Sequence, residues 1–158
     1  MNKLNLGCGE RKLRDYINID IVCNPDRVFD LTKPLDYEPN SVEVIQAIHL
    51  FEHLPRVGLE AVVKSWYDCL IPDGLLVMEM PDFEKITKIL LASQYENQTM
   101  MEWIFGEQSR PGQNHYWGWT PKQCVKFLES VGFRAVQVKE AEDNGHDKAI
   151  SFRVEAIK

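Results

Sequence analysis

The chain has 158 residues, of which 44% are hydrophobic and 27% are charged, a size and composition that suit one soluble domain with its own core. No apolar run approaches the roughly 18 residues of a membrane span, and the first residues lack the apolar stretch of a signal peptide, so we expect a cytoplasmic protein without a membrane partner. The net charge of −6 disfavours nucleic acid as a partner.

The first part of the chain predicts several short strands and then a helix. The apolar run at 4–6 ends in Gly-Cys-Gly, which indicates a buried strand followed by a tight turn. Alternating and β-branched residues predict a second strand at 16–21, and shorter apolar segments predict strands at 28–30 and 42–45. Apolar residues at helical spacing then predict a helix over 50–70, broken early by Pro55.

The middle of the chain begins with a turn and a strong strand signal. The turn at 72–74 leads into a fifth strand at 75–80. Residues 82–105 have a helical pattern, and residues 106–118 form a loop rich in glycine and aromatic side chains.

The last part of the chain predicts one helix and two strands. Thr120 is the expected N-cap of a helix with Pro121 at its first position, and Gly132 is expected to end that helix. Strands at 135–139 and 151–156 are expected to pair antiparallel. The alternation of strands and helices predicts an α/β domain with a mostly parallel sheet.

The glycine turn after the first strand points to a nucleotide-like ligand. Such ligands bind open α/β sheets at the carboxyl ends of the strands, and Gly7 and Gly9 let the backbone approach a ligand with no side chain between. Asp20 ends the second strand, where it can accept hydrogen bonds from ribose hydroxyls. A dinucleotide fits less well, because Lys12 replaces the third glycine of that fingerprint and Asp20 follows Gly9 too soon.

Taken in order, these motifs resemble the class I S-adenosylmethionine (SAM)-dependent methyltransferases, in particular small, type 11-like ones. Residues 4–9 are similar to the first motif of the family, and Asp20 is similar to its ribose-binding acid. Asp30 and Leu31 resemble the pair beside the adenine ring. Further segments resemble later motifs of the family in the same order: 41–45, 48–54, 70–76 and 132–133.

This resemblance implies a fold, a cofactor and an activity. The fold is a Rossmann-like class I methyltransferase sandwich over residues 1–158, with a mostly parallel sheet and a C-terminal antiparallel hairpin. The cofactor is SAM, the product is S-adenosylhomocysteine, and the methyl acceptor is an oxygen or nitrogen of a small or sugar-like molecule. A non-catalytic SAM- or nucleoside-binding module, or a subunit of a larger assembly, is the alternative. The implied cofactor-binding residues are Leu6, Gly7, Cys8, Gly9, Asp20, Ile21, Asp30, Leu31, Ala47 and His49.

One departure from the family predicts a trimmed fold. Only residues 10–15 separate the glycine turn from the second strand, which is too short for the usual crossover helix, so we expect that helix to be missing or reduced to a single turn. We also expect no segment ahead of the first strand to supply the amino-terminal lid of the family. We therefore expect one sheet face to be covered by a second subunit, as in a homodimer, or by an insertion at about 82–118 that also contributes to the acceptor pocket.

The segment from His49 to His53 also fits H-x-x-E-H, the pattern of inverted zinc proteases. Zinc binding by both histidines requires all five residues to lie in one helix, whereas this segment leaves a strand directly and precedes Pro55. No third ligand is identifiable, the four cysteines are widely spaced, and we predict no metal. In a methyltransferase, His49 would lie near the sulfonium and either face the acceptor or be structural.

The aromatic segment 103–119 suits a pocket wall better than a solvated connection, although a hydrophobic plug over the sheet edge is the alternative. His115 is the first candidate for the catalytic base, because the usual histidine pKa of about 6.5 suits proton removal at neutral pH. Tyr116 and His49 are the other candidates. His146 is expected in an exposed polar loop.

Overall fold

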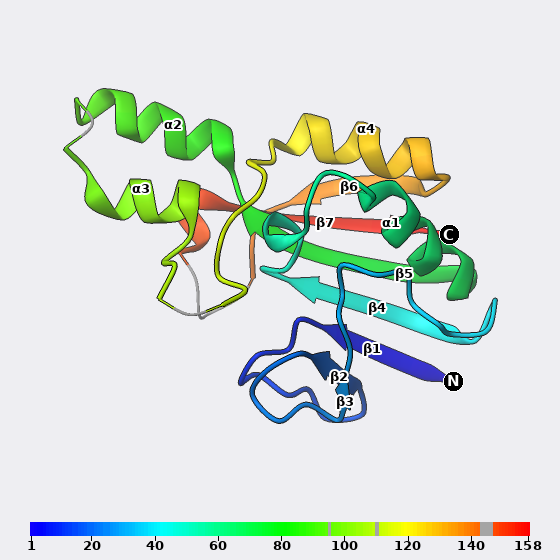
Figure 1. Cartoon of the computed structure of the whole chain (residues 1–158). Helices are drawn as coiled ribbons and strands as arrows, with labels where there is room; N and C mark the ends of the chain where they lie inside the picture. Colours follow the sequence, from blue (N-terminus) through cyan, green and yellow to red (C-terminus); the bar gives the residue numbers. More distant parts are fainter. Residues whose placement is uncertain (95, 110, 143–146) are drawn as a thin grey trace.

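The computed structural model describes residues 1–94, 96–109, 111–142 and 147–158, so His146 lies outside the described residues. A seven-stranded sheet with the order β3-β2-β1-β4-β5-β7-β6 runs through the described residues (Figure 1). β1 to β5 are parallel, whereas β7 is antiparallel to both β5 and β6, which confirms the predicted sheet and its terminal antiparallel pair. The strands are β1 (Asn2–Leu6), β2 (Ile17–Asp20), β3 (Arg27–Val28), β4 (Val42–Ile48), β5 (Leu70–Pro81), β6 (Arg134–Lys139) and β7 (Ser151–Ile157).

The helices follow the sequence pattern with two changes. The helix expected over 50–70 is divided into the 3₁₀ turn η1 (Phe51–His53) and α1 (Leu59–Cys69), because Pro55 cannot continue a helical hydrogen-bond ladder. The pattern over 82–105 is divided into α2 (Phe83–Ala92) and α3 (Gln98–Phe105). A further 3₁₀ turn, η2 (Lys148–Ile150), precedes β7.

α4 (Pro121–Val131) is the helix predicted most completely. The Thr120 hydroxyl accepts a hydrogen bond from the Gln123 backbone N–H at 3.3 Å, and Pro121 occupies the first turn. Gly132 ends the helix with a φ of +121°.

The main core lies between one face of the sheet and the helices α1 and α4 (Figure 1). Alternate side chains of β5 and β7 point into it, among them the fully buried Met78 and the buried Val154. Trp66 of α1 and Leu128 of α4 are fully buried against them. The turn expected at 72–74 lies inside β5 as an irregularity of the β4–β5 pairing.

The connection between β1 and β2 contains no helix, as the sequence predicted. Two buried asparagines hold this loop against the sheet in place of a helix. The Asn5 amide donates to Asn18 Oδ1 and to the Arg11 carbonyl, both at 2.9 Å. Asn18 Oδ1 also accepts from the Leu13 backbone N–H at 2.8 Å. The loop therefore has fixed polar anchors despite its lack of regular structure.

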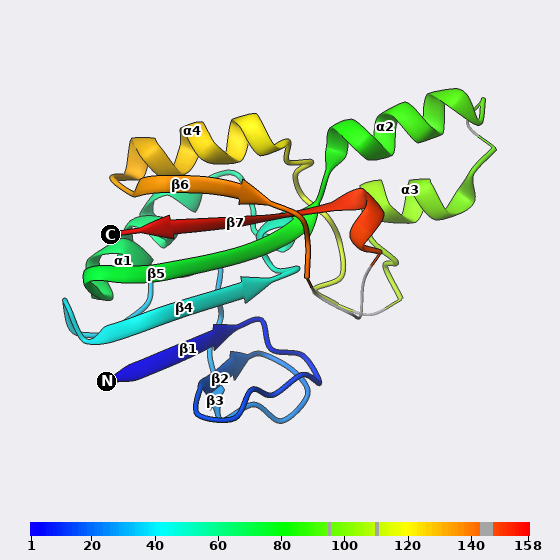
Figure 2. The ribbon, with the colours of Figure 1, turned by 180° about the vertical axis from the view of Figure 1, so that it is seen from behind.

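No helix of the described residues covers the opposite sheet face (Figure 2). The expectation that the insertion at about 82–118 covers it is wrong: α2 and α3 extend beyond the ends of β5 and β7 and share a small core of their own. On this face Arg153 donates to Glu79 and to Glu155, each at 2.8 Å. Coverage by a second subunit stays a prediction, and light scattering that found only monomers at high concentration would contradict it.

Candidate cofactor and acceptor site

A cleft of about 550 Å³ opens at the carboxyl ends of β1, β2, β3 and β4. This volume is within the usual range of small-molecule sites. Its position agrees with the rule that open α/β sheets bind ligands where their parallel strands end. The cleft is lined by many of the residues expected to hold a cofactor or to face the acceptor: Gly7, Cys8, Gly9, Asp20, Ile21, Asp30, Leu31, His49 and Tyr116. His53, which was not among those candidates, also lines it.

The two glycines of the first turn differ in what surrounds them. Gly7 and Gly9 have φ values of +69° and +50°, in the left-handed region that favours glycine. A Cβ added to Gly7 would lie 3.0 Å from the Leu50 side chain, whereas one added to Gly9 would meet nothing within 4 Å. Gly9 therefore leaves bare backbone beside open space in the cleft, which suits close approach of a ligand.

Two carboxylates stand beside this turn in fixed orientations. Asp20 Oδ2 accepts from the Gly9 backbone N–H at 2.8 Å, and its Oδ1 accepts from the Ile21 N–H at 2.6 Å. Asp30 Oδ1 accepts from the hydroxyl and the N–H of Thr32, and these hydrogen bonds lower the pKa of Asp30. Both groups line the cleft as anchored acceptors, which is the chemistry that ribose and adenine groups require.

Not every expected cofactor residue lines the cleft. Leu6 and Ala47 are fully buried in the core and are absent from the cleft lining. Cys8 does line it, but burial raises the pKa of its thiol to about 11, so it is protonated at neutral pH. Gln46 and Ile48 line the cleft although neither stood out in the sequence. Their side chains alternate with the core-facing ones of β4, and that alternation is the signal by which they could have been found.

His49 is the first residue after β4 and has a left-handed φ of +49°. Its side chain is 6% exposed, and its Nδ1 lies 3.1 Å from Glu52 Oε1. Its ring also meets the edge of Trp103. Because η1 contains only Phe51, Glu52 and His53, the H-x-x-E-H segment does not form the single helix that the inverted zinc-protease arrangement requires.

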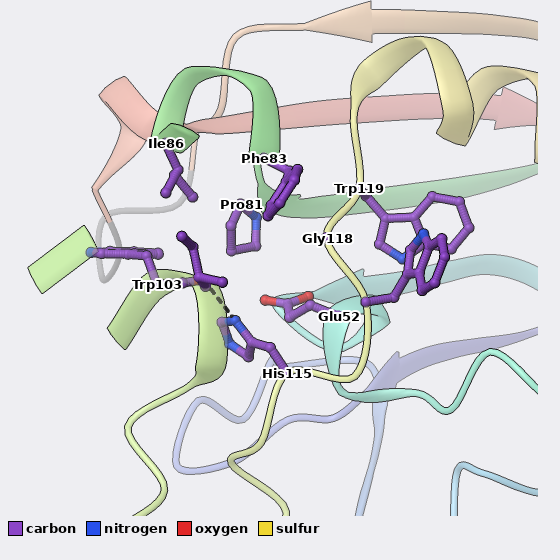
Figure 3. A pocket seen from close by; sticks show the side chains of 10 residues that line it. Glu52, Pro81, Phe83, Ile86, Trp103, His115, Gly118 and Trp119 are labelled. Carbon is purple, nitrogen blue, oxygen red and sulfur yellow. Dashed lines mark hydrogen bonds between the residues drawn. The ribbon is translucent and has the colours of Figure 1, made fainter. Parts of the chain in front are cut away.

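His115 does not line this cleft but lines a much smaller cavity of about 10 Å³ (Figure 3). Its Nδ1 is 2.8 Å from the Trp103 carbonyl oxygen, and burial lowers its pKa. Its ring meets the His53 ring edge-on with a centroid distance of 4.7 Å. Tyr116, which is 57% exposed, lines the main cleft instead. His53 thus lines the main cleft and contacts His115 of the smaller cavity, which its sequence position did not indicate.

Glu52 is the buried acid between these histidines. Burial raises the pKa of Glu52, but the hydrogen bond with His49 and the nearby His53 and His115 outweigh it and lower that pKa overall. The Glu52 carbonyl accepts from the Tyr116 N–H at 2.8 Å, so η1 and the aromatic loop are joined through their backbones. The cleft therefore has backbone and carboxylates at one end and imidazole and phenol groups at the other.

No protein-family model and no curated protein matches this chain. Solved structures do match. A SAM-dependent methyltransferase from Methanosarcina mazei is 17% identical with a TM-score of 0.70, and the match covers 99% of this chain and 92% of that one. A SAM-dependent methyltransferase from Archaeoglobus fulgidus is 16% identical with a TM-score of 0.67, covering 99% and 86%.

A third similar structure is the Burkholderia thailandensis 1,6-didemethyltoxoflavin-N1-methyltransferase with bound 1,6-didemethyltoxoflavin and S-adenosylhomocysteine. It is 14% identical with a TM-score of 0.63, and the match covers 99% of this chain and 70% of that one. At these identities the likeness shows the fold: this chain has the Rossmann-like class I fold of SAM-dependent methyltransferases. In the described part of the chain, no helix is long and apolar enough to cross a membrane.

Proposed function

We propose that this protein is a SAM-dependent methyltransferase that acts on an oxygen or nitrogen of a small-molecule or sugar-like acceptor. The observation that carries the proposal is the single cleft in which the glycine turn, Asp20 and Asp30 stand at one end and His53 and Tyr116 at the other. A cofactor held at the first end would present its reactive group toward the second, inside one continuous volume.

The residues present fit this cofactor. Gly9 leaves backbone open to the cleft, and Asp20 and Asp30 offer carboxylate oxygens to the ribose and adenine parts. When bound, SAM supplies a methyl group on a positively charged sulfur, which the acceptor takes up as it loses a proton, leaving S-adenosylhomocysteine. The exposed apolar side chain of Ile21, 54% accessible beside Asp20, is available to contact the adenine face.

The acceptor end of the cleft contains groups that can orient an acceptor and receive its proton. Alignment of an acceptor with the methyl group accounts for much of the rate in such reactions. His115, His49 and Tyr116 remain the proposed catalytic residues. His115 does not line the cleft, so the structure adds His53, which lines the cleft and contacts His115. The exposed Tyr116 is the most accessible of these to a bound acceptor.

The binding part of the proposal is tested by thermal unfolding with SAM and with S-adenosylhomocysteine. A ligand at 100 times its Kd adds about 2.7 kcal/mol to the free energy of unfolding, so both should raise the melting temperature. Asp20→Asn should lose most of that increase, since the variant has no carboxylate charge to offer the ribose. If neither compound raises the melting temperature of the wild type, the proposed function is wrong.

The catalytic part is tested by methyl transfer to a panel of acceptors. His115→Ala should keep the SAM affinity and lower the transfer rate at least about tenfold, because loss of a general base costs about 100-fold or more. An unchanged rate would contradict the role of His115. SAM binding without transfer to any acceptor would favour the non-catalytic module.

A further inference from the structure

Three side chains that can bind a metal converge beside the acceptor end of the cleft. Glu52, His53 and His115 each offer one ligand atom, and the three atoms all lie within 4.8 Å of one another. Glu52 and His53 come from η1, and His115 comes from the loop between α3 and α4. The hydrogen bond between the Tyr116 N–H and the Glu52 carbonyl brings the two segments together.

A second, independent observation is an unsatisfied acceptor aimed at the same point. The Glu52 side chain is 3% exposed, and its Oε2 has no hydrogen-bond partner among the described residues. A buried carboxylate oxygen without a partner costs free energy, and buried charges are usually paired or bound to a metal. In Figure 3 the Glu52 carboxylate and the His115 ring point toward the same small cavity. This cavity, of about 10 Å³, is close to the smallest volume that holds one water molecule.

The two histidine rings are oriented as metal ligands usually are. Nδ1 of His53 lies 3.1 Å from the Asn114 carbonyl oxygen, and Nδ1 of His115 lies 2.8 Å from the Trp103 carbonyl oxygen. A ring that donates its Nδ1–H to a carbonyl has a neutral Nε2 available for coordination, and this outer contact is typical of metal-binding histidines.

We propose that Glu52, His53 and His115 bind one divalent transition-metal ion, with Zn²⁺ as the preferred ion. Two imidazoles and one carboxylate suit zinc, and three protein ligands leave a fourth position for water or substrate. Ligand atoms in tetrahedral zinc sites are about 3.3 Å apart, given bonds of about 2.0 to 2.1 Å. The three side chains therefore close inward when the ion binds.

This site differs from the zinc arrangement that the H-x-x-E-H pattern suggests. In that arrangement His49 and His53 bind the metal and the glutamate does not. Here His49 instead binds Glu52 Oε1, which leaves Oε2 for the ion, and His115 supplies the ligand that the sequence pattern lacked. His49 is therefore a positioning residue for the Glu52 carboxylate.

The fourth position gives the ion a role that rests on the proposed function. His53 lines the main cleft, so a hydroxyl group of an acceptor that enters from the cleft can bind the ion beside it. A metal-bound hydroxyl loses its proton to water in the cleft more readily, because the cation stabilises the negative oxygen. In the metal-bound protein the ion therefore replaces His115 and His53 as the group that activates the acceptor, since a ring that donates its Nδ1–H and binds the ion through Nε2 cannot accept a proton. The acceptor class is then a small molecule with a metal-binding hydroxyl group.

The metal site is tested on the whole chain, purified without chelators and dialysed against dilute Zn²⁺. We expect about one zinc per chain by elemental mass spectrometry, and less than about one tenth of that in Glu52→Gln and in His115→Ala. Asp20→Asn is the matched control, because it changes the cofactor end and should keep its zinc while losing the stabilisation by SAM. Circular dichroism of each variant checks that it is folded.

A direct titration covers the case in which a variant fails to fold. Wild-type protein treated with a chelator and desalted should bind Zn²⁺ with a stoichiometry near one, and the melting temperature should rise with added Zn²⁺ but not with the same concentration of Mg²⁺. Absence of saturable Zn²⁺ binding, or equal zinc content in wild type and a folded His115→Ala, would overturn the site. Stabilisation by SAM without zinc binding would overturn the metal site alone, and the reverse result would overturn the methyltransferase proposal alone.

Discussion

At the scale of single residues, substitutions of the two glycines in the first turn should affect folding stability and ligand affinity differently. Gly9→Ala should cost about 1 kcal/mol of folding free energy, because alanine is strained in the left-handed backbone conformation at this position. The same variant should lower the SAM affinity at least about tenfold, because the added methyl group lies where a ligand approaches. Chemical denaturation and calorimetric titration with SAM measure the two effects.

Gly7→Ala provides the comparison. Its methyl group would meet the Leu50 side chain at 3.0 Å, so this variant should lose more stability, about 2 kcal/mol or more. Equal losses of stability in Gly7→Ala and Gly9→Ala would contradict the difference in packing.

Asp26 makes the glycine loop sensitive to acid. Its Oδ2 accepts from the backbone and the side-chain amide of Asn18, and with Lys12 these contacts lower the pKa of Asp26 to about 2. A carboxyl whose pKa is lower in the folded state stabilises the fold above its usual pKa near 3.8, and that stabilisation is lost as the pH falls toward 2. Wild type should therefore lose more stability between these pH values than Asp26→Asn, as measured by urea unfolding at each pH. Parallel pH profiles would contradict this role.

For single residues, the sequence predicts sites formed by neighbouring segments better than it predicts contacts between segments that are far apart in the chain. The glycine turn and Asp20 were identifiable because β1, the turn and β2 are close in sequence and all point to one ligand. The contact between His53 and His115 was not, because it depends on a loop that returns to η1 through one backbone hydrogen bond. The spacing of these two histidines in the sequence does not predict that they come into contact.

At the scale of elements, the start of α2 depends on one buried cap. Asp82, which is buried, accepts from the backbone N–H groups of Glu84 and Lys85. Asp82→Ala should cost about 1 to 2 kcal/mol, and Thr120→Ala at the start of α4 should cost less, because Thr120 is only partly buried and accepts a single bond at 3.3 Å. Denaturant unfolding of both variants checks the order, and a larger loss in Thr120→Ala would contradict it.

The same caps explain which elements the sequence predicts. Thr120, Pro121 and Gly132 are local signals at both ends of α4, and the helix has the predicted bounds. The break between α2 and α3 was missed, although Asn97 caps α3 by accepting from the Met100 N–H. One asparagine inside a helical pattern is too weak a signal, since only packing decides whether the chain turns there.

At the scale of the whole molecule, α2 and α3 form a unit with little connection to the main core. Their buried side chains Ile86, Leu90 and Met100 form a separate cluster with Ile150 of η2. We expect backbone amides in these two helices to exchange with deuterium faster than those of α1 and α4, because small clusters open locally at low free energy. Hydrogen-exchange mass spectrometry measures this difference.

A pair of core variants tests the same separation. Ile86→Ala should accelerate exchange within α2 and α3 and leave α1 protected, whereas Leu128→Ala should accelerate exchange throughout the sheet and its helices, since both side chains are fully buried but in different clusters. Equal effects of the two variants on α1 would show that the clusters unfold together.

The connections after β1, β2 and β3 contain no helix, and their residues form one side of the cleft. Ile21 and Val22 stand exposed there, so a ligand in contact with them borders directly on water. Under the proposed function, the spent cofactor would meet water on this side of the cleft, and residues 111–113 of the aromatic loop line the same cleft. The rate of cofactor exchange should then depend on the strength of the contacts between the cofactor and the cleft, and we expect this exchange to be rapid.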